Sequence, residues 1–592
     1  MQDLQTSAAV ALDIPASAPA AAPIPVAESA VPLPVLAVGA LAVTALAGCG
    51  GGGGGGDSAA PTPPANVITS LTIQDVGGGA VTVDTVVGTS AGVTFQLDGK
   101  AVSTSKPADP GPAGTAQVIP FAVSNGTSGA SLTVTINPTP TAVATASYST
   151  VRTTRASVAT AGFPPSWDEL MGYSGMTHTQ IVNRMVGRMS ATPFEAYPAW
   201  INDSVLSNSE YNALTTDQKT AYNNRAYPKR QEFKAWWFRQ MVTNPDSLTE
   251  RLLLFWHNVF TTSASAVNEP ELIARQHRLY RQQVGGNLRT FLKAMTRDPA
   301  MCLYLDSALN RKGAPNENFA RELMELFTLG ERTVYDAYAE ADVPIVAQCF
   351  TGYGLSPNKT FTFNPSDHDY QNGTGQDGTR TLWGDTFTAT SDDGDHVIDL
   401  ILARNDGSGH SCCAKYLINR LWHEFIGEKQ AGDDAVILTL ADKFRDDFAW
   451  DLPSLYKALL TTAAAQDVAR RGTRVRSPVE LYVGYYRAVS VRPAAWDENL
   501  YTTYILDQDL LDPQNVFGWP GGTSWITVKT LVDRTTFMSW VGYNYRDAVP
   551  SRLLQVLDLL LMTVDPITPP SENVNAGLRA RQYIIDPAYN LR

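Results

Sequence analysis

The chain has 592 residues, a formal net charge of −13 at pH 7, 44% hydrophobic residues and 17% charged residues. At roughly 100–200 residues per domain, this length excludes a single small module. The acidic balance argues against nucleic-acid binding, because phosphate recognition needs a cluster of Lys and Arg that the chain as a whole does not supply. The five cysteines are an odd number without metal-ligand spacing, which excludes a disulfide scaffold.

The first 65 residues read as a targeting segment. They are rich in Ala, Pro, Val and Gly, and they contain neither Lys nor Arg. An apolar run over 31–48 ends in the sequence LAGC, which resembles the lipobox at which bacterial lipoproteins are cleaved and lipidated, here on Cys49. We interpret 1–49 as a disordered, lipoprotein-like export signal and 50–65 as a flexible Gly/Pro-rich linker. The alternative is a generic Ala-rich secretion or anchor segment in which Cys49 is incidental.

This interpretation predicts where the protein resides. It predicts an exported bacterial lipoprotein, in the periplasm or on the outer-membrane or cell surface, with a lipid anchor in the membrane as its first partner. No nucleic-acid partner is expected.

Residues 66–146 show the period-two alternation of half-buried strands. Val93, Phe95 and Leu97 alternate with polar residues, as do the apolar residues of four similar stretches. Gly, Asn and Asp fall between these stretches as turn residues. The segment therefore predicts a small β-sandwich-like module.

From 147 to 592 helical periodicity dominates, and all seven histidines and all twelve tryptophans lie in this part. We expect a large multi-helix domain, so the fold class is mainly α. An irregular insert at about 352–394 is predicted to be a long loop or small hairpin, of the kind that tends to be functional. Helical periodicity covers 232–242, 247–260, 271–284, 288–296, 318–329, 342–350, 395–404, 415–426, 435–448, 452–462 and 478–489.

Several segments of the helical part resemble one bacterial family, known only as domain-of-unknown-function family 1800. The segment 310–330, NRKGAPNENFARELMELFTLG, is similar to its signature. Further similar segments are FWHNVFTTS at 255–263, DPAM at 298–301, AEADV at 339–343, FTG at 350–352, FTFNPSDHD at 361–369, RSPV at 476–479 and NVFGWPGG at 515–522.

The resemblance covers about residues 153–590 and implies a predominantly helical, exported protein, often accompanied by a second exported family that resembles sulfatases. It implies no settled activity. Many members have a histidine where this chain has Phe327, so a mechanism that needs that imidazole is not expected here.

The first candidate site lies on the predicted helix at 318–329. Glu317, Arg321, Glu322 and Glu325 lie opposite its apolar stripe. Glu322 and Glu325, three residues apart, could act as an acid and base pair, or bind a metal, in a cleft. The alternative is a solvated ladder of ion pairs four residues apart, such as Glu317 with Arg321.

The second candidate is His257, seven residues after Glu250 and therefore on the same helix face. It could supply an imidazole to the carboxylates of the first site. A histidine beside a tryptophan in an apolar helix is, however, more often a hydrogen-bonded core residue.

The third candidate is the pair His368 and Asp369 in the irregular insert. Imidazole and carboxylate oxygens are suitable ligands for a divalent metal, and Asn and Gly residues follow them. The alternative is an acidic surface turn. His423-Glu424 lacks the second histidine of a zinc-protease helix and is discounted.

A last candidate is the turn at 518–522, together with Trp525. Its two tryptophans could stack on a sugar ring, but we favour a structural role in which the indoles fill space between packed helices.

Two functional hypotheses follow. In the first, the protein is a metal- or carboxylate-dependent hydrolase or transferase acting on envelope or extracellular polymer, with the three candidate sites converging on one cleft. In the second, it is a non-catalytic, surface-tethered scaffold that binds an exported partner, with the polar clusters as structural networks.

Overall fold

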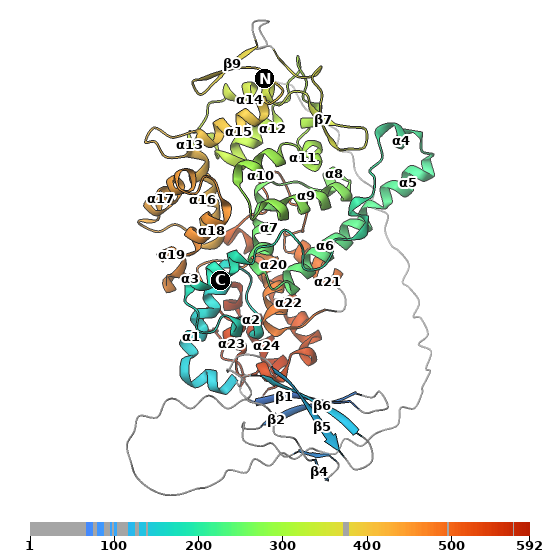
Figure 1. Ribbon diagram of the computed structural model, residues 1–592, viewed down its shortest axis with the longest axis vertical. Helices are drawn as coiled ribbons and strands as arrows, with labels where there is room; N and C mark the ends of the chain where they lie inside the picture. The colour runs from blue at the N-terminus through green and yellow to red at the C-terminus, as the bar shows by residue number, and fades with distance from the viewer. Residues whose placement is uncertain are drawn as a thin grey trace, which may run out of the picture.

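The computed structural model describes residues 67–74, 80–87, 95–97, 100–102, 117–124, 129–137, 140–370, 378–493, 496–571 and 574–592. Side chains are described from Val151 onward, except at 497 and 498. The lipobox-like sequence with Cys49 lies outside these residues. The fold is mainly helical (Figure 1).

The strands of the N-terminal part form a four-stranded antiparallel sheet with the order β2-β1-β6-β5, and β3 pairs with β4. Their alternating β-branched residues favour extended backbone. A sandwich of two packed sheets stays a prediction. The bounds are β1 Val67–Gln74, β2 Ala80–Val87, β3 Phe95–Leu97, β4 Lys100–Val102, β5 Gln117–Ser124 and β6 Gly129–Asn137.

The first helices carry the chain from residue 140 to the middle of the molecule. Many begin with a capping Ser, Thr, Asn or Asp whose side chain accepts a hydrogen bond from the first turn. They are α1 Pro140–Ala161, α2 Trp167–Gly172, α3 His178–Gly187, α4 Asn208–Ala213, α5 Thr216–Asn224, α6 Ala226–Thr243, α7 Ser247–Val259, α8 Ala264–Val267, α9 Pro270–Gln283, α10 Leu288–Met295, α11 Pro299–Tyr304 and α12 Asn318–Glu322.

The later helices complete the body. They are α13 Arg332–Tyr335, α14 Asp342–Cys349, α15 Asp393–Ala403, α16 Cys412–Phe425, α17 Asp433–Asp446, α18 Leu452–Leu460, α19 Ala463–Gln466, α20 Pro478–Val489, α21 Asp497–Ile505, α22 Val528–Asn544, α23 Leu557–Leu561 and α24 Ala576–Ile585. Short turns of other helix types are η1 Ala199–Asn202, η2 Ser307–Leu309, η3 Leu323–Thr328, η4 Val468–Arg470, η5 Gly522–Trp525, η6 Arg546–Ala548, η7 Ser551–Leu553 and η8 Pro587–Asn590.

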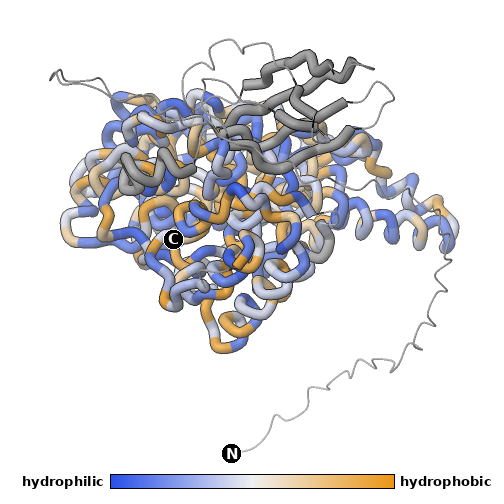
Figure 2. Tube along the Cα trace, turned by 90° about the horizontal axis from the view of Figure 1, so that it is seen from below, coloured by the Kyte–Doolittle hydropathy of each residue, from blue (hydrophilic) through white to orange (hydrophobic). Residues whose placement is uncertain are grey.

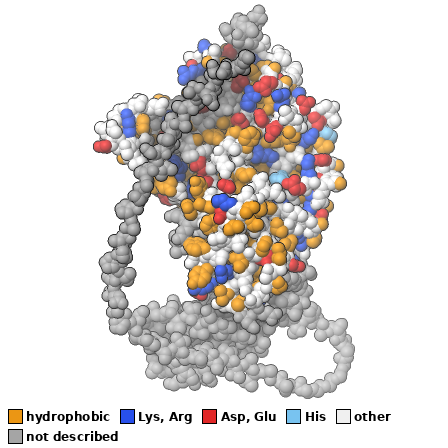
Figure 3. Space-filling model, turned by 180° about the vertical axis from the view of Figure 1, so that it is seen from behind, with side chains coloured by type: hydrophobic (Ala, Val, Ile, Leu, Met, Phe, Trp, Pro, Cys, Tyr) orange, Lys and Arg blue, Asp and Glu red, His pale blue; other side chains and the backbone are white. Residues whose placement is uncertain are grey.

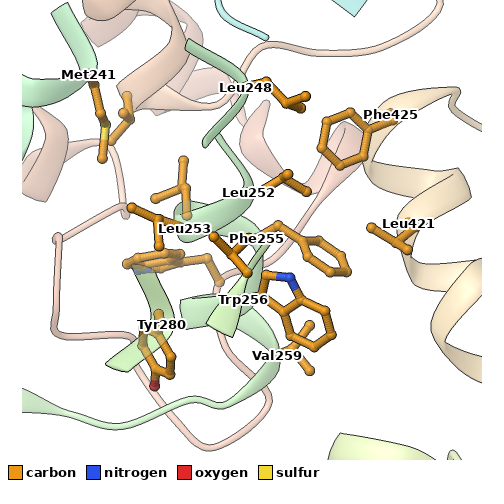
Figure 4. Packing of buried hydrophobic residues seen from close by; sticks show 14 of the residues in the cluster. Met241, Leu248, Leu252, Leu253, Phe255, Trp256, Val259, Tyr280, Leu421 and Phe425 are labelled. Atoms are coloured by element: carbon orange, nitrogen blue, oxygen red, sulfur yellow. The ribbon is translucent and has the colours of Figure 1, made fainter. Parts of the chain in front are cut away.

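Helix α7 runs through the centre of the core. Its residues are buried on almost every side, as expected for a helix surrounded by others. Figure 4 shows Trp256 between Leu421 and Phe425 of α16 on one side and Met241 and Tyr280 on the other. Its indole donates a hydrogen bond of 2.8 Å to the hydroxyl of Tyr456. Each large apolar side chain buried in this way contributes about 1.5–3 kcal/mol to stability.

Two charged groups inside the core have well-defined partners. Glu250 of α7 accepts hydrogen bonds from Arg281 of α9 (2.7 Å) and from Asn244 (2.8 Å), and both charged side chains are fully buried. Arg487 of α20 donates to three backbone carbonyls near the end of α6. These contacts satisfy the free carbonyls of a helix end, so these charges have a structural role.

The segment 352–394 contains two hairpins, with residues 371–377 left out of the described structure. Strand β7 (Tyr353–Leu355) pairs with β8 (Phe361–Phe363), and β9 (Thr379–Leu382) pairs with β10 (Asp385–Thr388). Gly352 has φ +80°, and a Cβ there would lie 2.6 Å from the carbonyl oxygen of Asn364. The first hairpin therefore needs glycine at this position.

Helices α4 and α5 project from the side of the body (Figure 1), and neither has a buried residue. The hydropathy colouring shows this arm as largely hydrophilic (Figure 2). Among the described helices, none combines the length and the apolar character that crossing a membrane requires.

Candidate functional site

The polar face of α12 is divided into two parts. Glu317 and Arg321 lie in solvent, where Arg321 pairs with Glu317 (3.3 Å) and more closely with Glu340 (2.7 Å). Arg332 approaches Glu340 as well, at 3.8 Å. Exposed pairs of this kind contribute little to stability, because solvent screens them. This geometry is that of a solvated ion-pair ladder. Arg321 makes its ion pairs with Glu317 and Glu340, and it acts on Glu322 only at longer range, where it slightly opposes the rise of the Glu322 pKa.

Glu322 and Glu325 form a separate carboxylate pair. Glu322 ends α12, and Glu325 lies in η3, a π-helical turn in which the Thr328 hydroxyl donates to the carbonyl of Leu323. Burial and the neighbouring Glu325 carboxylate raise the pKa of Glu322 to about 7. No cation lies within ion-pair distance of either carboxylate among the residues that the structure describes. Single π-turns in α-helices are frequent at functional sites.

A groove lies close to Glu322. Its volume is about 670 Å³, and Tyr304, Tyr504, Asp512 and Lys529 are among the residues that line it. The pKa of the Tyr304 hydroxyl is raised by burial and by the carboxylates of Glu322 and Asp512, so both acids are near enough to act on it electrostatically. Tyr304 therefore connects the carboxylate pair with the groove.

The floor of the groove is fixed by hydrogen bonds. Asp512 accepts from the hydroxyls of Ser263 and Ser265 and from the Ser265 backbone N–H. Asp509 pairs with Lys234 at 2.6 Å. Ser263 and Ser265 come shortly after the end of α7, the helix that also carries His257.

His257 is a core residue. Its side chain is buried among the rings of Trp237, Tyr280 and Trp519, with ring centroids 5.3–6.1 Å away. Burial lowers its pKa to about 3, so the imidazole is neutral at physiological pH. Its Nε2 atom has no hydrogen-bond partner in the described part of the chain. Within the described part of the chain, no hydrogen bond or ion pair joins His257 to Glu322 or Glu325.

His368 and Asp369 belong to a third neighbourhood, around the first hairpin. His368 Nδ1 lies 2.6 Å from the carbonyl oxygen of Thr351; a carbonyl only accepts, so Nδ1 carries the hydrogen. Its Nε2 lies 3.5 Å from Asp393, whose carboxylate is bonded by the Arg380 guanidinium. Arg380 also donates to the backbone carbonyl of Asp369.

These surroundings do not favour a divalent cation. The Arg380 guanidinium already neutralises Asp393 and would repel a second cation beside it. In the described segments, no group of three or more His, Cys, Asp or Glu side chains is arranged to hold a metal ion. The predicted ligand pair His368 and Asp369 thus lies beside a fixed positive charge.

A pocket that the sequence did not single out lies under the turn at 518–522. Its volume is about 110 Å³, and we call it the His423 pocket. His423 Nδ1 lies 3.3 Å from Glu428, and a Cβ on Gly521 would lie 3.3 Å from Nε2. Arg251, buried in the wall, pairs with Glu424 (2.8 Å) and Glu480 (3.2 Å).

The turn above this pocket is held by the residue that follows His257. The backbone N–H of Trp519 donates to the Asn258 side-chain oxygen at 2.6 Å. Gly518 has φ +87°, and a Cβ there would lie 2.2 Å from the same oxygen. Trp519 and Trp525 are each 5% exposed, so both indoles fill space between helices. No motif with a fixed spacing connects His423 to this turn, and only the fold brings them together.

The chain belongs to the family described as "Protein of unknown function (DUF1800)", whose family model matches residues 157–581. Neither a curated protein nor a solved structure matches it.

Proposed function

We propose that this protein is an exported, carboxylate-dependent hydrolase or transferase that acts on an envelope or extracellular polymer. The observation that carries the proposal is the Glu322–Glu325 pair, which has no cation at ion-pair distance among the described residues and whose Glu322 carboxylate acts on the pKa of Tyr304, a residue that lines an open groove. Of the candidate groups, only this pair combines a perturbed acid with a space for substrate.

The chemistry follows from the two protonation states. With a pKa of about 7, Glu322 is present in both its acidic and its basic form at neutral pH, which suits a general acid or base. Glu325, the neighbouring carboxylate, keeps that pKa high through like-charge repulsion. In a hydrolysis, Glu322 would deliver a proton to the leaving oxygen or take one from the attacking water.

The shape and lining of the groove support a polymer as substrate. It is open, and it offers the rings of Tyr304 and Tyr504 beside the hydroxyl and carboxylate groups of its floor. Aromatic rings beside hydrogen-bonding groups are suited to the apolar faces and the hydroxyls of sugars. An open groove also admits an internal segment of a long chain. A lipid anchor at Cys49 would hold such an enzyme beside the envelope.

The test is an activity screen with matched variants. The full chain is incubated with peptidoglycan and with neutral and acidic polysaccharides, and the release of reducing ends is measured. Glu322→Gln is expected to lower the rate at least 100-fold, since general acid–base catalysis contributes about 10²–10⁴. Glu317→Gln, in the solvated ladder of the same helix, is the control and should retain the rate. An unchanged rate in Glu322→Gln refutes the assignment.

A second variant separates catalysis from structure. Glu325→Gln removes the like charge, so the pKa of Glu322 should fall and the neutral limb of the pH–rate profile should move to lower pH. A merely structural role of Glu322 would leave that limb in place.

One surface favours the second hypothesis, a scaffold for an exported partner. Helix α22 buries one face, with Thr530, Arg534 and Met538, and packs against α24. Its other face exposes apolar side chains, among them Val528 at 88% and Val532 at 60%. Figure 3 shows hydrophobic side chains at the surface of the lower half of the helical body. Exposed apolar patches of this kind often mark protein interaction sites.

The scaffold hypothesis has its own test. The sulfatase-like protein that the family resemblance implies is the candidate partner. Co-purification of the two proteins should be lost in Val528→Asp and Val532→Asp, and should persist in Glu322→Gln. Loss in none of these variants would exclude the α22 face as the contact surface.

A further inference from the structure

A second cavity, separate from the carboxylate groove, is strongly cationic. It has a volume of about 200 Å³ and lies between α1, the end of α16 and the segment 464–474. Asp467 is its single carboxylate side chain among the described lining residues. Its basic lining residues are Arg155, Arg470, Arg471, Arg474, Arg592 and His178. We call it the arginine cavity.

Two of these arginines are neutralised by neighbours. Arg470 pairs with Asp433 at 2.9 Å and lies 3.7 Å from Asp467. Arg592 pairs with Glu480. Within the described part of the chain, the other three, Arg155, Arg471 and Arg474, have no carboxylate at ion-pair distance.

Arg155 is positioned in advance. It is buried in α1, and its guanidinium donates to the Thr563 hydroxyl at 3.1 Å and to the Leu560 carbonyl at 3.4 Å. Its Nε atom has no hydrogen-bond partner among the described residues. Because these bonds use neutral acceptors, they fix the group without removing its charge.

The positive charges repel one another. Burial and the nearby guanidinium groups of Arg476, Arg152 and Arg471 together lower the pKa of Arg155 to about 9. Burial and the Arg251 guanidinium lower the pKa of Arg474 to about 9, against an opposing effect of the Glu424 carboxylate. All remain charged at pH 7. Uncompensated buried charges destabilise a fold unless a partner neutralises them.

We propose that the arginine cavity binds a tetrahedral oxyanion, sulfate or phosphate, either as the free ion or as an ester on a saccharide. Arginine forks donate paired hydrogen bonds to such groups. The three guanidinium groups without an ion pair come from two segments that are distant in the sequence, α1 and 471–474, and Arg474 also lines the His423 pocket. One guanidinium group can bind both oxygens of a planar carboxylate. A tetrahedral anion has further oxygens, which can accept hydrogen bonds from several guanidinium groups at once.

Hydroxyl groups complete the cavity. Ser157 and Thr160 of α1 line it, and their hydroxyls donate to the backbone carbonyls of Thr153 and Ala156. The Thr563 hydroxyl accepts from Arg155, so its own hydrogen can be donated to an oxygen of the anion. The size fits an oxyanion with at most one attached sugar ring, since 200 Å³ is below the usual range of about 300–1,000 Å³ for drug-sized ligands. The proposal stands on this cavity alone and does not depend on the activity proposed for Glu322.

The experiment is calorimetric titration of the full chain with sodium sulfate and sodium phosphate, at ionic strength held constant with sodium chloride. The matched variants are Arg471→Gln and Arg474→Gln, which are half-buried, and the control is Arg311→Gln, an exposed arginine outside the cavity. We expect saturable binding that is at least tenfold weaker in the two cavity variants and unchanged in Arg311→Gln and in Glu322→Gln. Binding of equal strength in all variants would overturn the proposal, as would no binding of either anion to the wild type.

Two further arms distinguish the source of the anion and guard against misfolding. Galactose 6-sulfate and glucose 6-phosphate are titrated in parallel: tighter binding than the free ions assigns the cavity to an esterified saccharide, and weaker binding assigns it to the free ion.

Thermal unfolding in chloride should show a raised Tm for Arg474→Gln, because one repelling charge is gone. A Tm raised by sulfate in the wild type and not in this variant supports the site; an equal rise in both contradicts it.

Discussion

The raised pKa of Glu322 predicts a measurable pH dependence of stability. Glu322 has a pKa of about 7 in the folded protein, against 4.5 for the unperturbed side chain. Folding therefore favours the protonated form. Between pH 4.5 and 7 the folded state binds the proton more tightly than the unfolded state, so this residue makes the free energy of unfolding fall as the pH rises.

The magnitude can be worked from that pKa. At 1.36 kcal/mol per pH unit, a rise from 4.5 to about 7 corresponds to about 3 kcal/mol for a fully buried group. Glu322 is only half-buried, and solvent screening reduces the effect to roughly 1–2 kcal/mol. Glutamine has a similar shape and does not titrate, so Glu322→Gln should remove this penalty.

The assay is urea unfolding of the wild type and Glu322→Gln at pH 5 and pH 8. The variant should gain roughly 1–2 kcal/mol relative to the wild type on going from pH 5 to pH 8. Glu325→Gln should give part of that gain because it removes the repelling carboxylate, and Glu317→Gln should give none. If the difference between Glu322→Gln and the wild type is the same at both pH values, the inferred protonation of Glu322 is wrong.

Three further predictions concern the core and the turn above the His423 pocket. Gly518→Ala should destabilise the protein by about 2–4 kcal/mol, seen as a lower urea midpoint, because φ +87° and contact with Asn258 both oppose a side chain. Arg281→Met should cost about 3–5 kcal/mol in the same assay because it leaves the Glu250 charge buried and unpaired. The pKa of His257 is lowered to about 3 in the fold, so the protein should lose stability as the pH falls below 6.5, where this histidine is protonated in the unfolded chain. His257→Leu should reduce that loss by up to about 3 kcal/mol at pH 4.5. The measurement is urea unfolding of both proteins at pH 7 and pH 4.5.

The strongly periodic helices could be predicted from the sequence. Periodicity over 247–260 predicted a helix, and α7 spans Ser247–Val259. The predicted stripe of Phe319, Leu323, Leu326 and Phe327 is buried in the structure. Helix α22 was missed because apolar residues lie on both its buried and its exposed face, which removes the single stripe that marks an amphipathic helix. The π-helical form of η3 depends on backbone hydrogen bonds that no side-chain pattern reveals.

The candidate site could be predicted only in part, because ion pairs between residues that are distant in the sequence decide which carboxylates are left without a cation. The sequence placed Arg321 beside Glu317 and Glu325 at helical spacing. Whether Arg321 would neutralise the acids depended on Glu340, which lies 19 residues further along and binds it more closely. That contact leaves Glu322 to be perturbed by burial and by Glu325. The His423 pocket escaped detection for the same reason, since its walls come from five separate segments of the chain.

The segments that resemble the family gather in two places. Around α12, Gly352 donates its N–H to the Asn310 carbonyl, and His368 lies against Thr351. Under the turn at 518–522, Asn258 holds Trp519, and Ser477 lines the same pocket. Packing alone accounts for the second group, because its residues contact one another through a strained glycine turn and buried indoles. Packing does not account for the Glu322–Glu325 pair, because two neighbouring carboxylates without an ion-pair partner do not stabilise a fold.

This contrast separates structure from function by experiment. Asn258→Ala removes the acceptor of the Trp519 N–H, so it should lower the free energy of unfolding by about 1–3 kcal/mol and change the tryptophan fluorescence. It should leave the pH dependence caused by Glu322 intact. Glu322→Gln should do the reverse, retaining the fluorescence and gaining stability above pH 7. If both variants lose stability to the same extent at every pH, the acid pair belongs to the packing framework and the groove beside it is not a catalytic site.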